Sequence, residues 1–117
     1  MPPTALAKLA PPASAAAAWI DLRHALVART TPGPAVEVLE VFRPHDRSEP
    51  VEGWLAQVAD LIGDHQRVLI LGAGPLRLAL EREYVSRFRR RERIVDVEPS
   101  APMGREALIR RVEELAG

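Results

Sequence analysis

The sequence has 117 residues, enough for one hydrophobic core but not for two, so a single domain is expected. Its 16 Lys and Arg residues equal its 16 Asp and Glu residues in number, which excludes a general attraction to nucleic acid or to an anionic membrane and leaves only local basic patches for such binding. The absence of cysteine excludes disulfides, thiolate metal sites and thiol catalysis.

Residues 1–15 are rich in alanine and proline and predict a flexible leader, with residues 16–117 as the single folded domain. The leader is a poor signal peptide because it lacks a basic start and its prolines interrupt any apolar core. No run approaches the ~20 apolar residues that span a bilayer. We therefore expect a cytoplasmic protein with no membrane partner.

The first half of the chain predicts three strands, at residues 17–21, 24–29 and 35–42, joined by short links into an antiparallel meander. The alternation of apolar and polar residues along the third strand is interrupted near Leu39, which suggests a β-bulge. After a polar loop, with Ser48 as a candidate cap, an amphipathic helix is predicted over residues 51–62. Gly63 ends this helix.

In the second half, residues 68–71 are apolar in succession, as in a central strand buried on both faces. A turn, Gly72-Ala-Gly74, then opens a helix at Pro75, and on this helix Glu83 and Arg87 have the spacing of an ion pair. A last strand at residues 94–97 and a terminal helix complete the order βββαβαβα. With right-handed crossovers, this order predicts an α/β fold of the ribonuclease H-like type: a mixed sheet of strand order 3-2-1-4-5 with helices on both faces.

Three stretches then carry a family resemblance: Ala18-Trp-Ile-Asp21 with His24-Ala25, Val68-Leu-Ile-Leu-Gly-Ala-Gly74 with Arg77, and Arg93-Ile-Val-Asp-Val-Glu98. In this order and spacing, over roughly residues 17–116, the chain resembles small bacterial proteins described as translational machinery proteins. These are similar to the middle domain of archaeal and eukaryotic peptide-chain release factors and of Pelota-type ribosome-rescue factors. The resemblance implies a ribonuclease H-like fold and a role on the ribosome or on RNA.

The departures from this family bear on catalysis. Release factors carry a Gly-Gly-Gln loop between the third strand and the first helix, where it helps water attack peptidyl-tRNA, but residues 44–50 here hold neither Gly nor Gln. The family's G-P-G-x-x-K turn appears as Gly72-Ala-Gly-Pro-Leu-Arg77, and its Thr-Asp-rich start of the last helix is reduced to Met103-Gly104. We therefore expect no peptide release, no enzymatic activity and no cofactor.

The turn at Gly72 and Gly74 could bind a phosphate or an RNA backbone together with Arg77, because it lies at the carboxyl end of a strand and opens a helix. Alternatively, its small residues merely permit a tight, closely packed turn. Five arginines crowd the end of the second helix and the loop after it, where they could contact RNA phosphates: Arg87, Arg89, Arg90, Arg91 and Arg93. The alternative is a solvated face favoured by the helix dipole.

Asp21 has the place of the first metal carboxylate of a ribonuclease H-like nuclease, but the fourth strand ends in Gly72 and Asp96 lies on the far strand. The alternative is that Asp21 ends its strand and bonds the turn before His24. The three histidines do not have the spacing of metal ligands. We expect neither a metal site nor catalytic residues.

These patterns predict a non-catalytic accessory domain associated with the ribosome or RNA, with contact residues at residues 72–77 and 87–93. One alternative is a protein-interaction module, or one that self-associates into a homo-oligomer through the edge strand at residues 36–42. Another is a binder of a phosphate or nucleotide ligand at the Gly72–Arg77 turn.

Overall fold

The computed structural model describes residues 13–44 and 50–117. Most of the predicted leader, residues 1–15, lies outside the described residues, and so do the candidate cap Ser48 and one of the three histidines, His45. The leader's last residue, Ala15, belongs to the first strand, which begins two residues earlier than predicted. All six residues of this strand are buried, so its small alanines continue the sheet where composition suggested a leader.

The sheet has five strands in the order β3-β2-β1-β4-β5, as predicted. β1 pairs antiparallel with β2, and β2 with β3, whereas β1–β4 and β4–β5 are parallel pairs. The mixed sheet expected from a meander followed by two crossovers is therefore confirmed. The strands are β1 (Ala15–Ile20), β2 (His24–Thr30), β3 (Val36–Phe42), β4 (Arg67–Gly72) and β5 (Ile94–Pro99).

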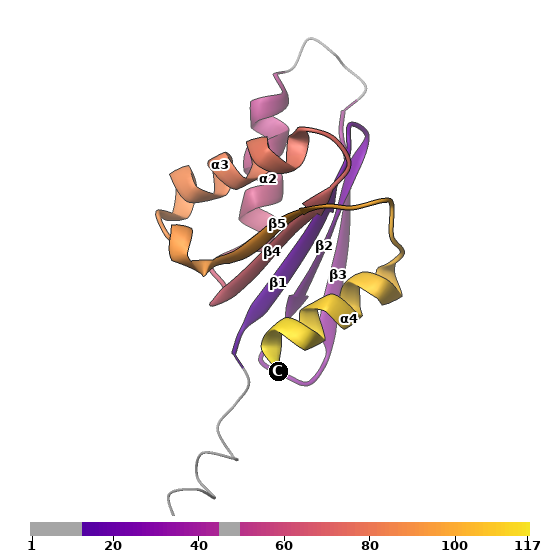
Figure 1. The fold of residues 1–117 in the computed structure, drawn as a ribbon, viewed down its shortest axis with the longest axis vertical. Helices are drawn as coiled ribbons and strands as arrows, with labels where there is room; N and C mark the ends of the chain where they lie inside the picture. Colours follow the sequence, from indigo (N-terminus) through magenta and orange to yellow (C-terminus); the bar gives the residue numbers. More distant parts are fainter. Residues whose placement is uncertain (1–12, 45–49) are drawn as a thin grey trace, which may run out of the picture.

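Helices cover both faces of the sheet, also as predicted (Figure 1). α2 (Val51–Ile62) and α3 (Leu76–Phe88) lie on one face and contact each other, and α4 (Arg105–Ala116) lies on the other. A short 3-10 helix, η1 (Arg91–Arg93), joins α3 to β5. The result is a three-layer domain in which the shared sheet divides the hydrophobic core into two clusters, one on each face, which we call the two cores.

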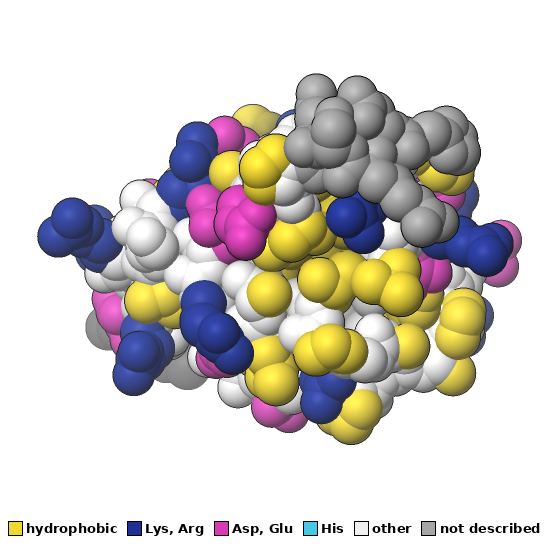
Figure 2. Space-filling model, turned by 90° about the horizontal axis from the view of Figure 1, so that it is seen from above, with side chains coloured by type: hydrophobic (Ala, Val, Ile, Leu, Met, Phe, Trp, Pro, Cys, Tyr) yellow, Lys and Arg dark blue, Asp and Glu magenta, His cyan; other side chains and the backbone are white. Residues whose placement is uncertain are grey.

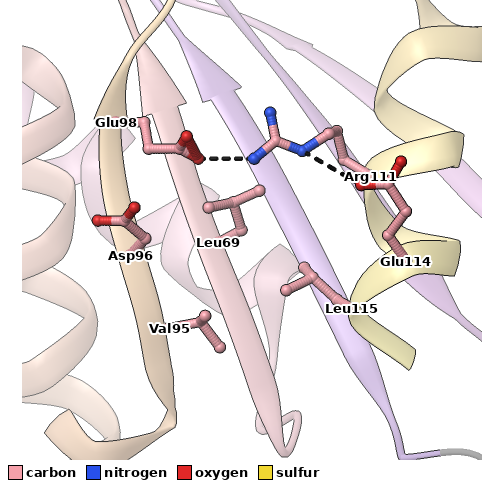
Figure 3. Close-up of a pocket in the computed structure, with 7 residues that line it drawn as sticks. All are labelled: Leu69, Val95, Asp96, Glu98, Arg111, Glu114 and Leu115. Atoms are coloured by element: carbon pink, nitrogen blue, oxygen red, sulfur yellow. Dashed lines mark hydrogen bonds and ion pairs between the residues drawn. The ribbon is translucent and has the colours of Figure 1, made fainter. Parts of the chain in front are cut away.

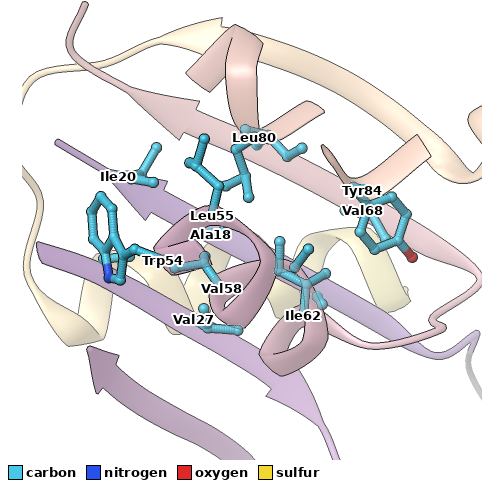
Figure 4. Close-up of a cluster of buried hydrophobic side chains, with 14 residues drawn as sticks. Ala18, Ile20, Val27, Trp54, Leu55, Val58, Ile62, Val68, Leu80 and Tyr84 are labelled. Carbon is cyan, nitrogen blue, oxygen red and sulfur yellow. The ribbon is translucent and has the colours of Figure 1, made fainter. Parts of the chain in front are cut away.

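The larger core lies beneath α2 and α3 (Figure 4). Every second residue of the strands packs into this core, because successive side chains of a strand point to opposite faces of the sheet. On β1, Ala18 and Ile20 face this core, while Ala17 and Trp19 face α4. The helices contribute Trp54, Leu55, Val58, Ile62, Leu80 and Tyr84.

The predicted bulge near Leu39 is wrong. β3 pairs with β2 without interruption, from Val36 opposite Thr30 to Phe42 opposite His24. The alternation of apolar and polar residues is interrupted at Leu39 because helices cover both faces of the sheet. Apolar residues are therefore favoured on both faces of β3. The irregularity lies instead between β4 and β5, where Val95 is an extra residue without a partner on β4.

Candidate nucleic-acid interface

The turn after β4 needs its two glycines for reasons of packing and backbone conformation. A Cβ on Gly72 would clash with the carbonyl oxygen of Ile20 on the neighbouring strand β1. Gly74 has a φ of 76°, in the left-handed region that favours glycine, and open space where its side chain would be. The carbonyl of Gly72 accepts a hydrogen bond from Ser100 N at 2.9 Å. Binding of a phosphate here stays a prediction.

Arg77 lies in the first turn of α3, directly beside this loop. Its Nη1 donates to the carbonyl oxygen of Gly74, three residues earlier. Its Nε is buried and has no hydrogen-bond partner among the described residues. The half-buried guanidinium is therefore held against the turn that it follows.

The other five arginines of the predicted contact set lie at the opposite end of α3 and in the segment that follows it. Two of them form ion pairs, one with Asp60 in the last turn of α2 and one with Asp64 just after this helix. Arg87 donates from Nη2 to Asp60 Oδ2 at 2.6 Å and from Nε to Asp60 Oδ1. The hydrogen bond to Asp60 raises the pKa of Arg87. Arg93 Nη1 donates to Asp64 Oδ1 at 2.6 Å. Both guanidiniums thus join α3 and η1 to α2, and Arg87 pairs with Asp60 instead of the predicted Glu83.

The other three arginines, Arg89, Arg90 and Arg91, are exposed, and none takes part in the ion pairs found between described residues. Arg89 ends α3 in the left-handed conformation, with a φ of 55°, and its N–H donates to the carbonyl of Val85. Within the described ranges it is the one residue other than glycine with a positive φ. We call Arg89, Arg90 and Arg91 the basic corner.

The eight predicted contact residues therefore form two groups. Gly72, Gly74 and Arg77 lie at the start of α3, and Arg87, Arg93 and the basic corner lie at its end. Twelve residues of α-helix separate Arg77 from Arg89, a distance of roughly 18 Å along the axis. A single phosphate could not contact both groups, whereas a nucleic-acid strand laid along α3 could reach both.

Asp21 has the turn-forming role that was considered as the alternative to a metal ligand. Its Oδ1 accepts hydrogen bonds from the backbone N–H groups of Arg23 (2.7 Å) and His24 (2.8 Å). Burial alone would raise the pKa of Asp21, but these two donors and the neighbouring His24 and Arg23 charges outweigh it and lower the pKa.

Asp21 and Asp96, the two carboxylates considered for a nuclease site, lie far apart. Asp96 on β5 is paired with Leu69 on β4, and Leu69 is paired with Ala17 on β1. Asp96 is therefore level with Ala17, two strands away from β1, whereas Asp21 lies four residues further along the chain from Ala17. Strand spacing and rise give a separation on the order of 16 Å. In the part of the chain that the structure describes, no three His, Asp or Glu side chains come close enough to hold a metal ion.

Sequence reasoning missed an aromatic row on three neighbouring strands. The rings of Trp19 and His24 lie 5.5 Å apart and those of His24 and Phe42 5.9 Å apart. Phe42 is 68% exposed and Leu22 is 67% exposed. Figure 2 shows apolar side chains gathered on the end of the molecule that it views. Only the strand register brings these residues together, and no local pattern in the sequence reveals it.

Comparison with solved structures identifies the same fold in translation factors. Pelota from Archaeoglobus fulgidus superposes with a TM-score of 0.63 at 14% identity, over 96% of this chain and 34% of that chain. The archaeal translation termination factor aRF1 gives a TM-score of 0.59 at 16% identity, over 81% of this chain and 32% of that chain. A structure described as an archaeal protein gives 0.59 at 13% identity, over 88% and 32%.

The chain thus spans about a third of the length of these proteins. At these identities the comparison shows a shared fold, which confirms the predicted resemblance to the middle domain of such factors at the level of structure. No protein-family model matches the sequence, and no curated protein gives a significant match. None of the helices in the described ranges is long and apolar enough to cross a membrane.

Proposed function

We propose that this protein is a non-catalytic accessory domain that associates with the ribosome or its RNA through the basic corner. The observation that carries the proposal is the presence of three exposed arginines that form no ion pair with a described residue, on a fold shared with Pelota and a translation termination factor. Arg87 and Arg93 are occupied by Asp60 and Asp64, so they hold the corner in place and contribute less charge to a ligand.

The backbone at Arg89 supports a functional role for this corner. A residue other than glycine costs about 1 kcal/mol or more in the left-handed conformation, and glycine is the usual residue at this position after a helix. The chain places an arginine there instead. This strained arginine, beside two further exposed arginines, supports a phosphate-contacting surface at the corner.

The test is co-sedimentation of the purified protein with ribosomes at low and at moderate salt. The variant carries Arg89→Glu, Arg90→Glu and Arg91→Glu, none of which removes an ion pair between described residues. We expect salt-sensitive pelleting of the wild type and its loss in the variant. If each arginine contacts one phosphate, the dependence of log affinity on log salt should become shallower by about 2 to 3.

The matched control changes three other exposed arginines, none of them on α3, to glutamate: Arg23, Arg105 and Arg110. It alters the net charge by the same amount and should pellet like the wild type. Equal loss of pelleting in both variants would show that the interaction depends on net charge and not on the basic corner. A wild type that stays in the supernatant at low salt would refute the proposal.

A self-associating module is the second candidate, favoured by β3. This strand is one edge of the sheet, and it ends in the exposed Phe42. An unpaired strand edge can pair with a second copy of itself. Sedimentation velocity would then give a concentration-dependent dimer that the basic-corner variant leaves intact and Val38→Pro disrupts.

A further inference from the structure

A hollow of about 280 Å³ opens beside α4, above β4 and β5 (Figure 3). Its apolar lining comes from Leu69, Val95 and Leu115. Val95 is the extra residue of the β5 irregularity, and 56% of its surface is exposed. An apolar side chain is thus presented to solvent at the edge of a groove between a helix and a strand.

The groove exists because the two faces of the sheet are covered unequally. On one face α2 and α3 lie side by side and together extend from β2 to β5. On the other face α4 is the one helix among the described elements, and it packs mainly on β1 and β2. Helices that pack together lie 8–10 Å apart. No described helix therefore occupies the position beside α4, across β4 and β5, on this face.

The rim of the groove is acidic. Glu98 is bound by Arg111, with Nη2 and Oε2 2.6 Å apart, and Glu114 lies 4.0 Å from the Nε of the same guanidinium. Asp96 is exposed and forms no ion pair with a described residue. Three carboxylates and one guanidinium thus line the groove, so the groove favours cationic side chains.

The shape argues against two other kinds of ligand. The volume lies just below the usual range of small-molecule pockets, and the hollow is partly open to solvent. An added strand is disfavoured at the β5 edge, because the irregularity at Val95 and the exposed charge of Asp96 are features that prevent edge pairing.

We propose that this groove binds an amphipathic helix of a partner protein, one that carries lysine or arginine beside its apolar stripe. The apolar side chains of the partner would pack on Val95 and Leu115, and its cations would pair with Asp96 and Glu114. The proposal is independent of RNA binding at the basic corner, since it uses the opposite face of the sheet.

The test uses a fluorescently labelled peptide of leucine and lysine whose order gives an amphipathic helix, and a scrambled peptide of the same composition. Binding to the full chain is followed by fluorescence anisotropy at low salt. We expect the helical peptide to bind more tightly than the scrambled one. Asp96→Lys together with Glu114→Lys should weaken binding by about tenfold or more.

The matched control is Glu40→Lys with Glu52→Lys, which makes the same change in net charge at exposed residues elsewhere and should leave binding unchanged. A further variant, Val95→Asn, removes apolar contact without changing charge and should also weaken binding. Far-UV circular dichroism and thermal unfolding establish that each variant is folded.

The absence of peptide binding would overturn the proposal, and so would equal binding of the two peptides or an effect of charge without any effect of Val95→Asn. A concentration-dependent dimer that is broken by the Asp96 and Glu114 changes would identify a second copy as the occupant and would also overturn it.

Discussion

At the scale of single residues, Gly72 and Gly74 show how one turn can need glycine twice for different reasons. At Gly72 an added methyl group meets a backbone oxygen of β1, which cannot move without disturbing the pairing of β1 with β4. At Gly74 there is room, but the positive φ strains any other residue.

We therefore predict that Gly72→Ala lowers the free energy of unfolding by about 2–3 kcal/mol and that Gly74→Ala lowers it by about 1 kcal/mol. Gly53→Ala is the control, because Gly53 lies inside α2 with open space around its Cβ position, and alanine there should stabilise the protein by about 0.5–1 kcal/mol. Urea unfolding measures all three. A fully stable Gly72→Ala variant would remove the packing explanation and strengthen the phosphate-ligand alternative.

At the scale of elements, the end of α3 combines a strained residue with the proposed contact surface. Arg89 occupies the left-handed position at which a glycine would relieve the strain. If the basic corner contacts RNA, stability and binding should therefore respond in opposite directions to a change at this one position.

Arg89→Gly is expected to raise the free energy of unfolding by about 0.5–1 kcal/mol, since relief of strain exceeds the entropic cost of glycine. The same change should weaken ribosome pelleting. Arg89→Ala retains the strained conformation, so it should weaken pelleting equally without the gain in stability. Urea unfolding and co-sedimentation, carried out on the same preparations, measure the two effects. An Arg89→Gly variant that is less stable than Arg89→Ala would contradict the explanation by backbone strain.

At the scale of the whole molecule, the central strands connect the two cores. Alternate residues of β1 and β4 pack beneath α2 and α3 or beneath α4, so neither core can form without the same sheet. Each core contains one tryptophan: Trp54 on the side of α2 and α3, and Trp19 on the side of α4. The Trp19 indole N–H also donates to the carbonyl of Ala101 at 3.1 Å, which ties the loop before α4 to β1.

We predict that both cores unfold in one transition. In Trp19→Phe the remaining fluorescence reports the core under α2 and α3, and in Trp54→Phe it reports the core under α4. Within each variant the urea midpoint by fluorescence should equal that by far-UV circular dichroism. Trp19→Phe should be the less stable of the two by about 1 kcal/mol, because it loses a hydrogen bond. Separate midpoints would show that the faces unfold independently.

The sequence by itself determined the elements, their order and the strand order of the sheet. Apolar spacing identifies a helix or a buried strand locally, as in residues 51–62 and 68–71, and chain connectivity then limits the topology. Turn chemistry was equally readable: Asp21 bonds the two N–H groups that a turn at this point requires. These features depend on residues close together in the chain.

Only the tertiary structure decided which charges remain available. Arg87 and Arg93 look like Arg89 and Arg90 in the sequence, yet the packing of α2 against α3 brings Asp60 and Asp64 to the first two. The separation of Arg77 from the basic corner, the irregularity at Val95 and the groove beside α4 likewise follow from register and helix placement. Such contacts join residues distant in the chain, and no local periodicity specifies which side chains will meet.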